Sequence, residues 1–266
     1  MSTRLGVVSY LNTKPLVRAF ETGAIEHDFE LLFDLPSACA RRLHAGETDV
    51  ALIPSIEIAR ASVPYSVVPS VGITSLGPVT SVLLVHRTDT REIQSLALDN
   101  GSRTSAALVQ IVLARQFGCR PTVFESVPDL DAMMRQADAA LVIGDAALEL
   151  DRKTFGVIDL GQAWTEMTGL PFVYACWTGR PDALTPQAAS KLVQAKELGC
   201  DEIPAIAEAY ASAHRHPPET YNRYLEDIIR YSMGEPELEG LNRYYAYAME
   251  LGLIDQAPTL GFYPVG

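Results

Sequence analysis

The 266-residue sequence has few cysteines, a deficit of cations and no long apolar run. Its four cysteines lie far apart and form no CxxC pair, so we expect small buried hydrophobic residues at these positions. Lys and Arg number 21 against 33 Asp and Glu, which gives a formal net charge of −12. This balance argues against nucleic acid or an anionic membrane surface as a partner, because both are bound through clustered cations. No apolar run approaches the roughly 20 residues that a membrane-spanning helix needs.

Motifs that mark common cofactors and nucleophiles are missing as well. The sequence contains no HExxH, no Cys/His cluster, no GxGxxG, no GxxxxGK[ST] and no GxSxG. His214 and His216 are two residues apart, which puts them on different faces of a helix and disfavours a metal pair. We therefore predict no metal and no cofactor. The first residues run straight into a strand-like segment without a secretion signal, which favours a cytoplasmic protein.

Length and patterning predict an α/β protein with two lobes. A chain of 266 residues corresponds to about two domains or one large one, and it buries enough surface to fold without a disulfide or a metal. Short β-like segments alternate with helical ones, as in the βαβ units of a mostly parallel sheet. The first elements are predicted as strands over Arg4–Val8, Glu30–Asp34 and Asp49–Ile53, a helix from Asn12 to Phe20, and a helix over Ala38–Ala45 capped by Ser37.

The pattern restarts near residue 80. Further strands are predicted over Thr80–His86, Ser95–Leu98, Pro121–Phe124, Ala139–Ile143 and Phe172–Trp177, with helices over Ala106–Phe117 and Asp129–Gln136. From about Thr185 the chain is predicted to be helical to its end, with turn signals at Gly199, Pro217–Pro218 and Gly234–Pro236. Since no Gly/Ser-rich linker separates the halves, we expect interleaved lobes. The first comprises residues 1–80 and 177–266, the second residues 81–176, and a ligand cleft lies between them.

Polar turns follow several predicted strands where each gives way to a helix. The turn at Ser9–Leu16 offers neutral hydrogen-bonding groups, and the turn at Asp99–Ser105 adds Arg103, whose fork matches a carboxylate. A helix N-terminus supplies free N–H groups and a partial positive charge, so these turns predict a site for a small organic anion. The alternatives are ordinary capping and a solvated arginine. The predicted substrate-binding residues are Ser9, Tyr10, Ser55, Ser102, Arg103, Thr104, Ser105 and Gly144.

Three residues are predicted to carry the chemistry: Asn12, Ser81 and Asp145. Asp145 is an acid/base candidate if burial in the cleft raises its pKa, and a helix N-cap otherwise. Strand alternation lets only one of Thr80 and Ser81 face the cleft. The tyrosines of the helical tail fit packing stripes and are predicted as core residues: Tyr221, Tyr224, Tyr231, Tyr244, Tyr245 and Tyr247.

Six sequence blocks, in order along the chain, resemble the chorismate dehydratases of the futalosine pathway of menaquinone biosynthesis. They span about two thirds of the sequence, and the helical last third matches in character only. The blocks are Ser9–Leu16 (SYLNTKPL), Asp49–Ser55 (DVALIPS), Gly77–Val82 (GPVTSV), Ser102–Ser105 (SRTS), Ile143–Leu148 (IGDAAL) and Leu170–Trp177 (LPFVYACW).

The resemblance implies a type II periplasmic-binding-protein-like fold, with mixed sheets, helices on both faces and a helical C-terminal region. It implies a lyase that dehydrates chorismate, a dicarboxylate, to 3-[(1-carboxyvinyl)oxy]benzoate. We expect Asn12 and Ser81 to orient the substrate, the turn of Ser102, Thr104 and Ser105 to hold a carboxylate, and either Asp145 or a substrate carboxylate to be the base. The alternatives are a non-catalytic cytoplasmic binding protein for a small acid, and the sister 1,4-dihydroxy-6-naphthoate synthase activity. The lack of a histidine after Ile143 argues against the sister activity.

Overall fold

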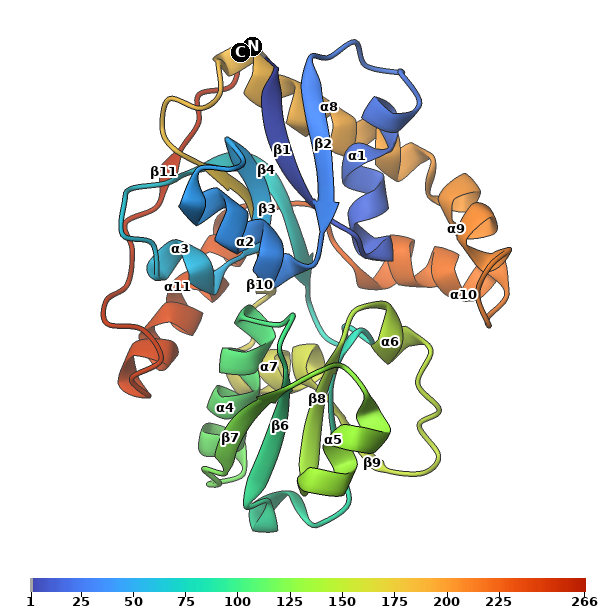
Figure 1. Cartoon of the computed structure of the whole chain (residues 1–266), viewed down its shortest axis with the longest axis vertical. Helices are drawn as coiled ribbons and strands as arrows, with labels where there is room; N and C mark the ends of the chain where they lie inside the picture. The colour runs from blue at the N-terminus through green and yellow to red at the C-terminus, as the bar shows by residue number, and fades with distance from the viewer. Residues whose placement is uncertain (1) are drawn as a thin grey trace.

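Two mixed β-sheets, one in each lobe, organise the chain in the computed structural model, which describes residues 2–266 (Figure 1). The first sheet has six strands in the order β11-β4-β10-β3-β1-β2, and the second has five in the order β7-β6-β8-β5-β9. In the first sheet β1 pairs in parallel with β2 and β3, while β10 runs antiparallel to β3 and β4. In the second, β6 is parallel to β7 and β8, and β5 is antiparallel to β8 and β9. The predicted fold class, α/β with mixed sheets, is confirmed.

The elements of the first lobe follow from alternating apolar strands and short helices. Every residue of β3 is buried, as expected for a central strand covered on both faces. The strands are β1 (Thr3–Val8), β2 (Phe29–Asp34), β3 (Val50–Pro54), β4 (Ser66–Ser75), β10 (Phe172–Gly179) and β11 (Gly261–Phe262), and the helices are α1 (Lys14–Glu21), α2 (Pro36–Ala45) and α3 (Ile56–Ala59). A 3₁₀ turn, Leu11–Thr13, leads into α1.

The second lobe repeats this construction around β8, which is likewise buried at every position. Its strands are β5 (Val82–His86), β6 (Ser95–Asp99), β7 (Thr122–Ser126), β8 (Ala139–Ile143) and β9 (Gly156–Asp159), and its helices are α4 (Thr104–Gln116), α5 (Leu130–Gln136), α6 (Asp145–Leu148) and α7 (Leu160–Thr168), with a short 3₁₀ turn at Thr90–Glu92.

The chain passes between the sheets twice, after β4 and before β10. Asp159, at the end of β9, ties the first passage to the N-terminus of α7. Its carboxylate accepts backbone N–H groups of Val79 and Thr80, the latter at 2.7 Å, and those of Gly161 and Gln162. Thr80 has a left-handed backbone with φ of 60°. The prediction that Thr80 begins a strand is therefore wrong, because it lies in the turn that precedes β5.

The sheet to which each strand belongs defines the boundary between the lobes. Because all of β10 pairs with β3 and β4, residues Phe172–Trp177 lie in the first sheet. A division along the sheets thus places the return passage between α7 and β10, earlier than the predicted boundary at residue 177.

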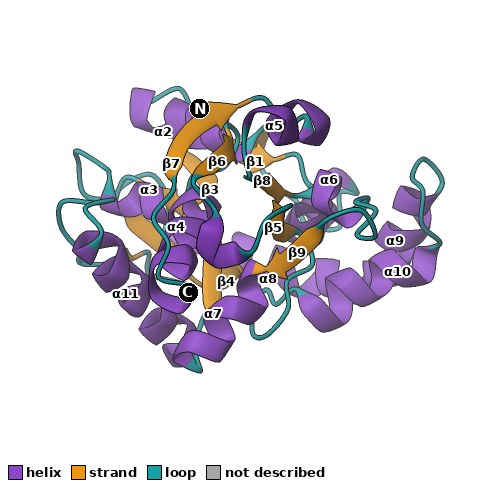
Figure 2. Ribbon diagram, turned by 90° about the horizontal axis from the view of Figure 1, so that it is seen from below, coloured by secondary structure: helices purple, strands orange, loops and turns teal. Residues whose placement is uncertain are grey.

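The C-terminal helices lie on both sides of the first lobe, with α9 and α10 on the opposite side of the molecule from α11 (Figure 2). They are α8 (Pro186–Asp201), α9 (Ile203–Ala211), α10 (Pro218–Arg223) and α11 (Glu235–Glu250), with a π-helical turn at Tyr224–Ile228 after α10. The prediction of a turn at Gly199 is wrong, since α8 continues through it. A Cβ atom at Gly199 would lie 1.8 Å from the carbonyl oxygen of Pro15, so the glycine lets α8 pack directly on α1.

Ser37 is not the cap of α2. Leu35 occupies the N-cap position and Pro36 begins the helix, so Ser37 lies within the first turn. The backbone N–H of Ser37 instead donates to the carbonyl of Gly101 in the second lobe, at 3.2 Å.

Candidate active site

A hollow between the two lobes brings together the ends of strands from both sheets. It holds about 580 Å³, counting the space at its open mouth. Its walls are mostly apolar, with polar groups gathered at the start of α1 and the start of α4. The lining residues are Val8, Tyr10, Asn12, Thr13, Pro36, Leu52, Pro54, Ile73, Val79, Ser81, Val82, Ser102, Arg103, Thr104, Ser105, Ile143, Gly144, Tyr174, Ala175 and Ile229. An apolar cleft with a few convergent polar groups is the usual form of a small-molecule site.

The N-terminus of α4 faces this hollow without a cap. No side chain of the described residues caps the helix, and its first turn therefore keeps N–H groups that can be donated to a ligand. The hydroxyl of Ser102 is buried and has no hydrogen-bond partner among residues 2–266. Ser105, also buried, lines the same wall. A helix N-terminus with free N–H groups and a free hydroxyl is suited to bind a carboxylate.

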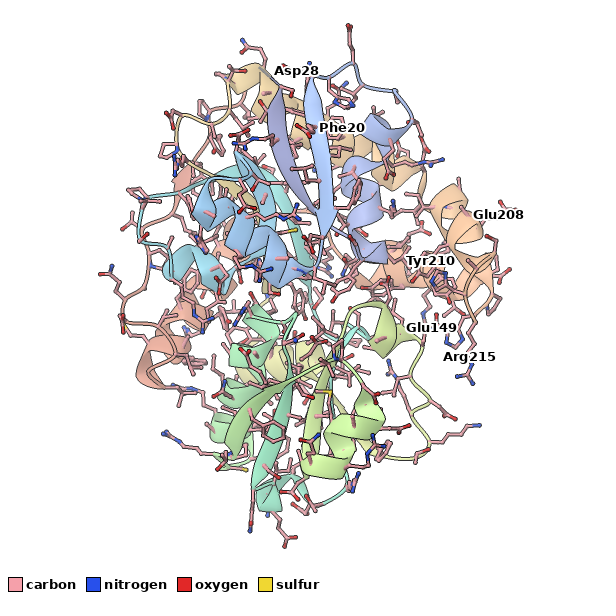
Figure 3. All side chains as sticks on the ribbon, in the orientation of Figure 1. Phe20, Asp28, Glu149, Glu208, Tyr210 and Arg215 are labelled. Atoms are coloured by element: carbon pink, nitrogen blue, oxygen red, sulfur yellow. The ribbon has the colours of Figure 1, made fainter. Side chains whose placement is uncertain are left out.

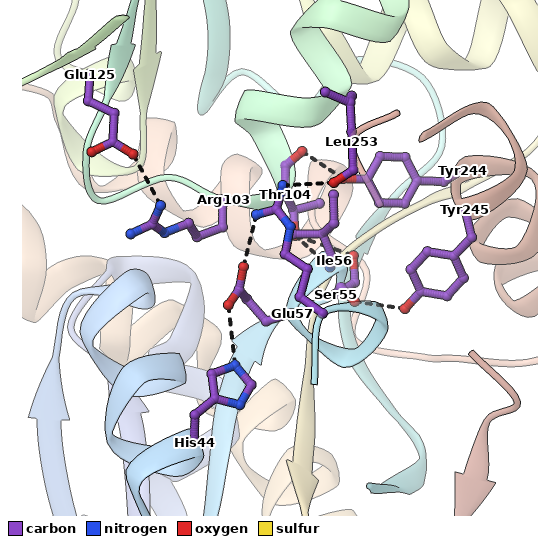
Figure 4. A network of polar contacts seen from close by, with 11 residues as sticks. His44, Ser55, Ile56, Glu57, Arg103, Thr104, Glu125, Tyr244, Tyr245 and Leu253 are labelled. Atoms are coloured by element: carbon purple, nitrogen blue, oxygen red, sulfur yellow. Dashed lines mark hydrogen bonds and ion pairs between the residues drawn. The ribbon is translucent and has the colours of Figure 1, made fainter. Parts of the chain in front are cut away.

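This end of α4 is fastened to the first lobe (Figure 4). The hydroxyl of Thr104 accepts the N–H of Ile56 at 3.2 Å, and Tyr244 donates to the carbonyl of Thr104 at 2.9 Å. Ser55 lies beneath the same contact, where its hydroxyl donates to the carbonyl of Val173 at 2.8 Å. The N-terminal end of α4 is thus held at a fixed place relative to the first sheet.

The guanidinium of Arg103 is directed towards Glu125, with which it pairs at 3.2 Å (Figure 4). Both side chains are substantially exposed, so the pair contributes about 1 kcal/mol or less. Arg103 lines part of the hollow, but its charge is engaged outside it.

On the opposite wall, Asn12 and Ser81 meet through a third residue. The Nδ2 atom of Asn12 donates to the hydroxyl of Tyr224 at 3.1 Å, and that hydroxyl donates to Oγ of Ser81 at 2.8 Å. Sequence patterning assigns Tyr224 to the core, and it is indeed buried, yet it connects two of the three candidate catalytic residues. No local signal distinguishes it, because it lies 212 residues from Asn12.

The ring of Tyr10 rests against Gly144. A Cβ atom at position 144 would lie 2.8 Å from the Tyr10 ring, and Gly144 has a left-handed backbone with φ of 63°, so only glycine fits. Burial raises the pKa of Tyr10, which keeps its phenol protonated as a donor. Close by, the buried hydroxyl of Thr13 has no partner among the described residues. Thr13 also lines the hollow; it belongs to the predicted polar turn Ser9–Leu16 but is not among the predicted substrate-binding residues.

Three predicted site residues do not reach the lining of the hollow. Ser9 is exposed at the surface. Ser55 is fully buried and its hydroxyl is used in the contacts beneath α4. Asp145 begins α6 and points to the other lobe, where its Oδ1 atom accepts the N–H of Leu11 at 3.1 Å. The geometry thus gives Asp145 a contact between lobes instead of a place in the cavity wall.

The Asp145 contact belongs to a set of contacts between α6 and the first lobe. Nearby, Tyr221 of α10 donates a hydrogen bond to Glu149, which follows α6. Figure 3 shows Glu149 of the second lobe below Tyr210 of α9. Burial raises the pKa of Asp145, although the bond from Leu11 acts in the opposite direction.

Replacing Asp145 with asparagine is expected to change how stability depends on pH. The raised pKa means that the folded protein binds this proton more tightly than the unfolded chain does, so the charged carboxylate costs stability above that pKa. Protonation removes this cost as the pH falls toward about 3.9, the pKa of an aspartate in the unfolded chain. We expect urea denaturation to show the wild type gaining stability relative to Asp145→Asn as the pH is lowered from about 7 to about 4. If the difference in unfolding free energy between the wild type and Asp145→Asn stayed constant or changed in the opposite direction, burial would not raise the pKa of Asp145 in the folded protein.

Within residues 2–266 no group of three or more His, Cys, Asp and Glu side chains is placed to hold a metal ion. In the same range no helix has both the length and the apolar character needed to cross a membrane.

Comparison with known proteins gives consistent matches along nearly the whole chain. Residues 3–250 match the protein family described as menaquinone biosynthesis. The chorismate dehydratase of Thermus thermophilus is 30% identical over 98% of this chain and 98% of its own, and that of Campylobacter jejuni is 28% identical over 93% and 98%.

Solved structures with a similar fold include a protein of Archaeoglobus fulgidus, with a TM-score of 0.79 at 19% identity, covering 95% of this chain and 98% of that one. The periplasmic aliphatic sulphonate binding protein of Escherichia coli has a TM-score of 0.65 at 16% identity, covering 97% and 93%. At these identities the likeness establishes the fold, which is that of the periplasmic binding proteins, as predicted.

Proposed function

The chain belongs to the menaquinone-biosynthesis family, and we propose that it is a lyase that dehydrates chorismate to 3-[(1-carboxyvinyl)oxy]benzoate. In this reaction a base removes the ring proton from the carbon that bears the enol-ether oxygen. The electron pair of that C–H bond completes the aromatic ring while the neighbouring C–O bond breaks. The hydroxyl leaves with its electron pair and, together with a proton, forms one water.

The observation that carries the proposal is the uncapped N-terminus of α4, with the free Ser102 hydroxyl, at the wall of an apolar hollow. A substrate with two carboxylates and a non-aromatic ring needs both an anion site and an apolar enclosure. We assign one carboxylate to the first-turn N–H groups of α4 with Ser102 and Ser105. Since the whole chain carries a net charge of −12, this binding rests on local donors and not on long-range attraction.

Orientation is the main contribution that this site makes to the reaction. Aromatisation makes the elimination favourable, so the protein has to hold the reacting carbons and the leaving hydroxyl in the right geometry. We assign this to Asn12 and Ser81 on one wall, with the Tyr10 ring beside them. The apolar lining around Leu52, Ile73 and other aliphatic residues offers few hydrogen-bonding partners to water beside the reacting atoms.

The lining of the hollow also bears on the proton acceptor. Among the described residues that line it there is no Asp, Glu, His or Lys. Asp145 is turned toward Leu11. We therefore assign the role of base to a carboxylate of the substrate, which lies within the same molecule as the proton it removes. A roughly hundredfold fall in kcat for Asp145→Asn, the size expected on loss of a general base, would contradict this assignment.

The test is turnover of chorismate by the purified protein. We expect consumption of chorismate and appearance of a single aromatic product whose mass is that of chorismate less one water, followed by absorbance and by mass spectrometry. Binding of chorismate without turnover, measured by calorimetry at the same protein concentration, would identify a binding protein and contradict the enzyme assignment.

We also propose that the protein acts in the cytoplasm. Its four cysteines are free thiols and three of them are buried. Unpaired cysteines are what a reducing compartment maintains.

A further inference from the structure

The phenol of Tyr224 joins two side chains that come from distant parts of the chain. It donates to Oγ of Ser81 at 2.8 Å and accepts from Nδ2 of Asn12 at 3.1 Å. Tyr224 itself is 3% exposed and lies behind the cavity wall, whereas Asn12 and Ser81 both line the hollow. Within residues 2–266, neither of those two side chains makes another hydrogen bond, so each is held through Tyr224 alone.

An unusual backbone holds Tyr224 in this place. It begins the π-helical turn Tyr224–Ile228, in which the N–H of Ile229 bonds to the carbonyl of Tyr224 at 2.9 Å. The next residue, Arg230, pairs with Thr74 of β4 through two backbone bonds of 2.9 Å each. The turn therefore directs the phenol inward and puts Ile229 on the cavity wall. Single π turns are rare and occur often at functional sites.

The single phenol hydrogen fixes the direction of the hydrogen bonds. Because it is donated to Ser81, the phenol oxygen can only accept from Asn12, which must present its Nδ2 to Tyr224. The Oδ1 acceptor of Asn12 and the hydroxyl hydrogen of Ser81 then remain for a molecule in the hollow. An acceptor beside a donor matches a hydroxyl group, which has one hydrogen to give and lone pairs to receive one.

We propose that Tyr224 is a positioning residue that sets Asn12 as the acceptor and Ser81 as the donor for the leaving hydroxyl of the substrate. This inference rests on the proposed dehydratase function. Tyr224 acts only through the two other residues. Its removal should therefore impair the chemical step more than substrate binding, which depends on the separate N-terminus of α4.

The test compares Tyr224→Phe with a matched control, Tyr231→Phe. Tyr231 is a buried tyrosine of the same region whose hydroxyl has no hydrogen-bond partner among the described residues. Both variants keep the ring and lose one oxygen. For Tyr224→Phe we expect kcat to fall roughly tenfold, with KM within about threefold of wild type, since two neutral hydrogen bonds are lost. For Tyr231→Phe we expect wild-type kinetics.

Thermal unfolding of both variants checks that each is folded as stably as the wild type. A double substitution tests whether the effect of Tyr224 passes through Ser81. Since Tyr224 also holds Asn12, Tyr224→Phe in a Ser81→Ala background should lower kcat by less than it does alone, because the part of its effect that passes through Ser81 is already lost. A full multiplication of the two effects, or unchanged kcat in Tyr224→Phe, would overturn the inference while leaving the dehydratase function intact. A wild-type protein that does not convert chorismate would overturn the proposed function, and the inference with it.

Discussion

Replacing Asn12 with alanine is expected to lower kcat for chorismate dehydration about a hundredfold, the cost of losing one preorganised polar group at a reacting centre. The amide lies at the cavity wall just before α1 and is fixed by a buried partner, Tyr224. Its loss removes the acceptor for the leaving hydroxyl and frees the Tyr224 phenol. KM should change less than kcat, because the carboxylate site on α4 is untouched.

Steady-state kinetics with chorismate measure this effect, and Asn242→Ala is the matched control. Asn242 is an exposed asparagine on α11 and is not among the residues lining the hollow. It should have wild-type kinetics. If Asn12→Ala retained kcat within about threefold, less than a single hydrogen bond is worth in the transition state, then Asn12 would not be part of the reacting centre.

Replacing Asp159 with alanine is expected to cost about 3 kcal/mol of unfolding free energy, because four backbone N–H groups lose their acceptor and α7 loses its cap. The same carboxylate supports the left-handed backbone of Thr80, next to Ser81. The substitution should therefore also disturb the site.

Urea denaturation gives the size of the effect, with Asp129→Ala as a comparison. Asp129 caps α5 through a single bond to Ala132, at an exposed position within one lobe. Its removal should cost about 1 kcal/mol, the ordinary value of a cap. If Asp159→Ala cost no more than Asp129→Ala, then Asp159 would be only a helix cap and would not stabilise the passage at Val79 and Thr80.

Part of the candidate site can be predicted from the sequence because of one geometric regularity. Polar turns at the ends of strands in a sheet gather at one edge, so the sequence predicts that the turns near Asn12 and Ser102 share one cleft. Side-chain direction could not be predicted in this way. Arg103 pairs with Glu125, and Asp145 accepts the N–H of Leu11; both partners come from other elements, which the local sequence does not reveal.

The sequence pattern does not predict the longest strand, β4, and the reason is physical. Its sequence includes Pro69 and Gly72, residues that normally interrupt strands. The structure accommodates them through irregular pairing with β10, where the register shifts twice, and through a positive φ of 62° at Ser70. Tyr224 was missed because its role depends on contacts 143 and 212 residues away.

The most direct test of the proposed active site is a crystal structure of the protein with 3-[(1-carboxyvinyl)oxy]benzoate, the proposed product. We expect density in the hollow between the lobes, with one carboxylate on the first turn of α4 at Ser102 and Ser105, and the ring between Tyr10 and the Asn12–Ser81 wall. Density at another surface, or a carboxylate held by Arg103 outside the hollow, would contradict it.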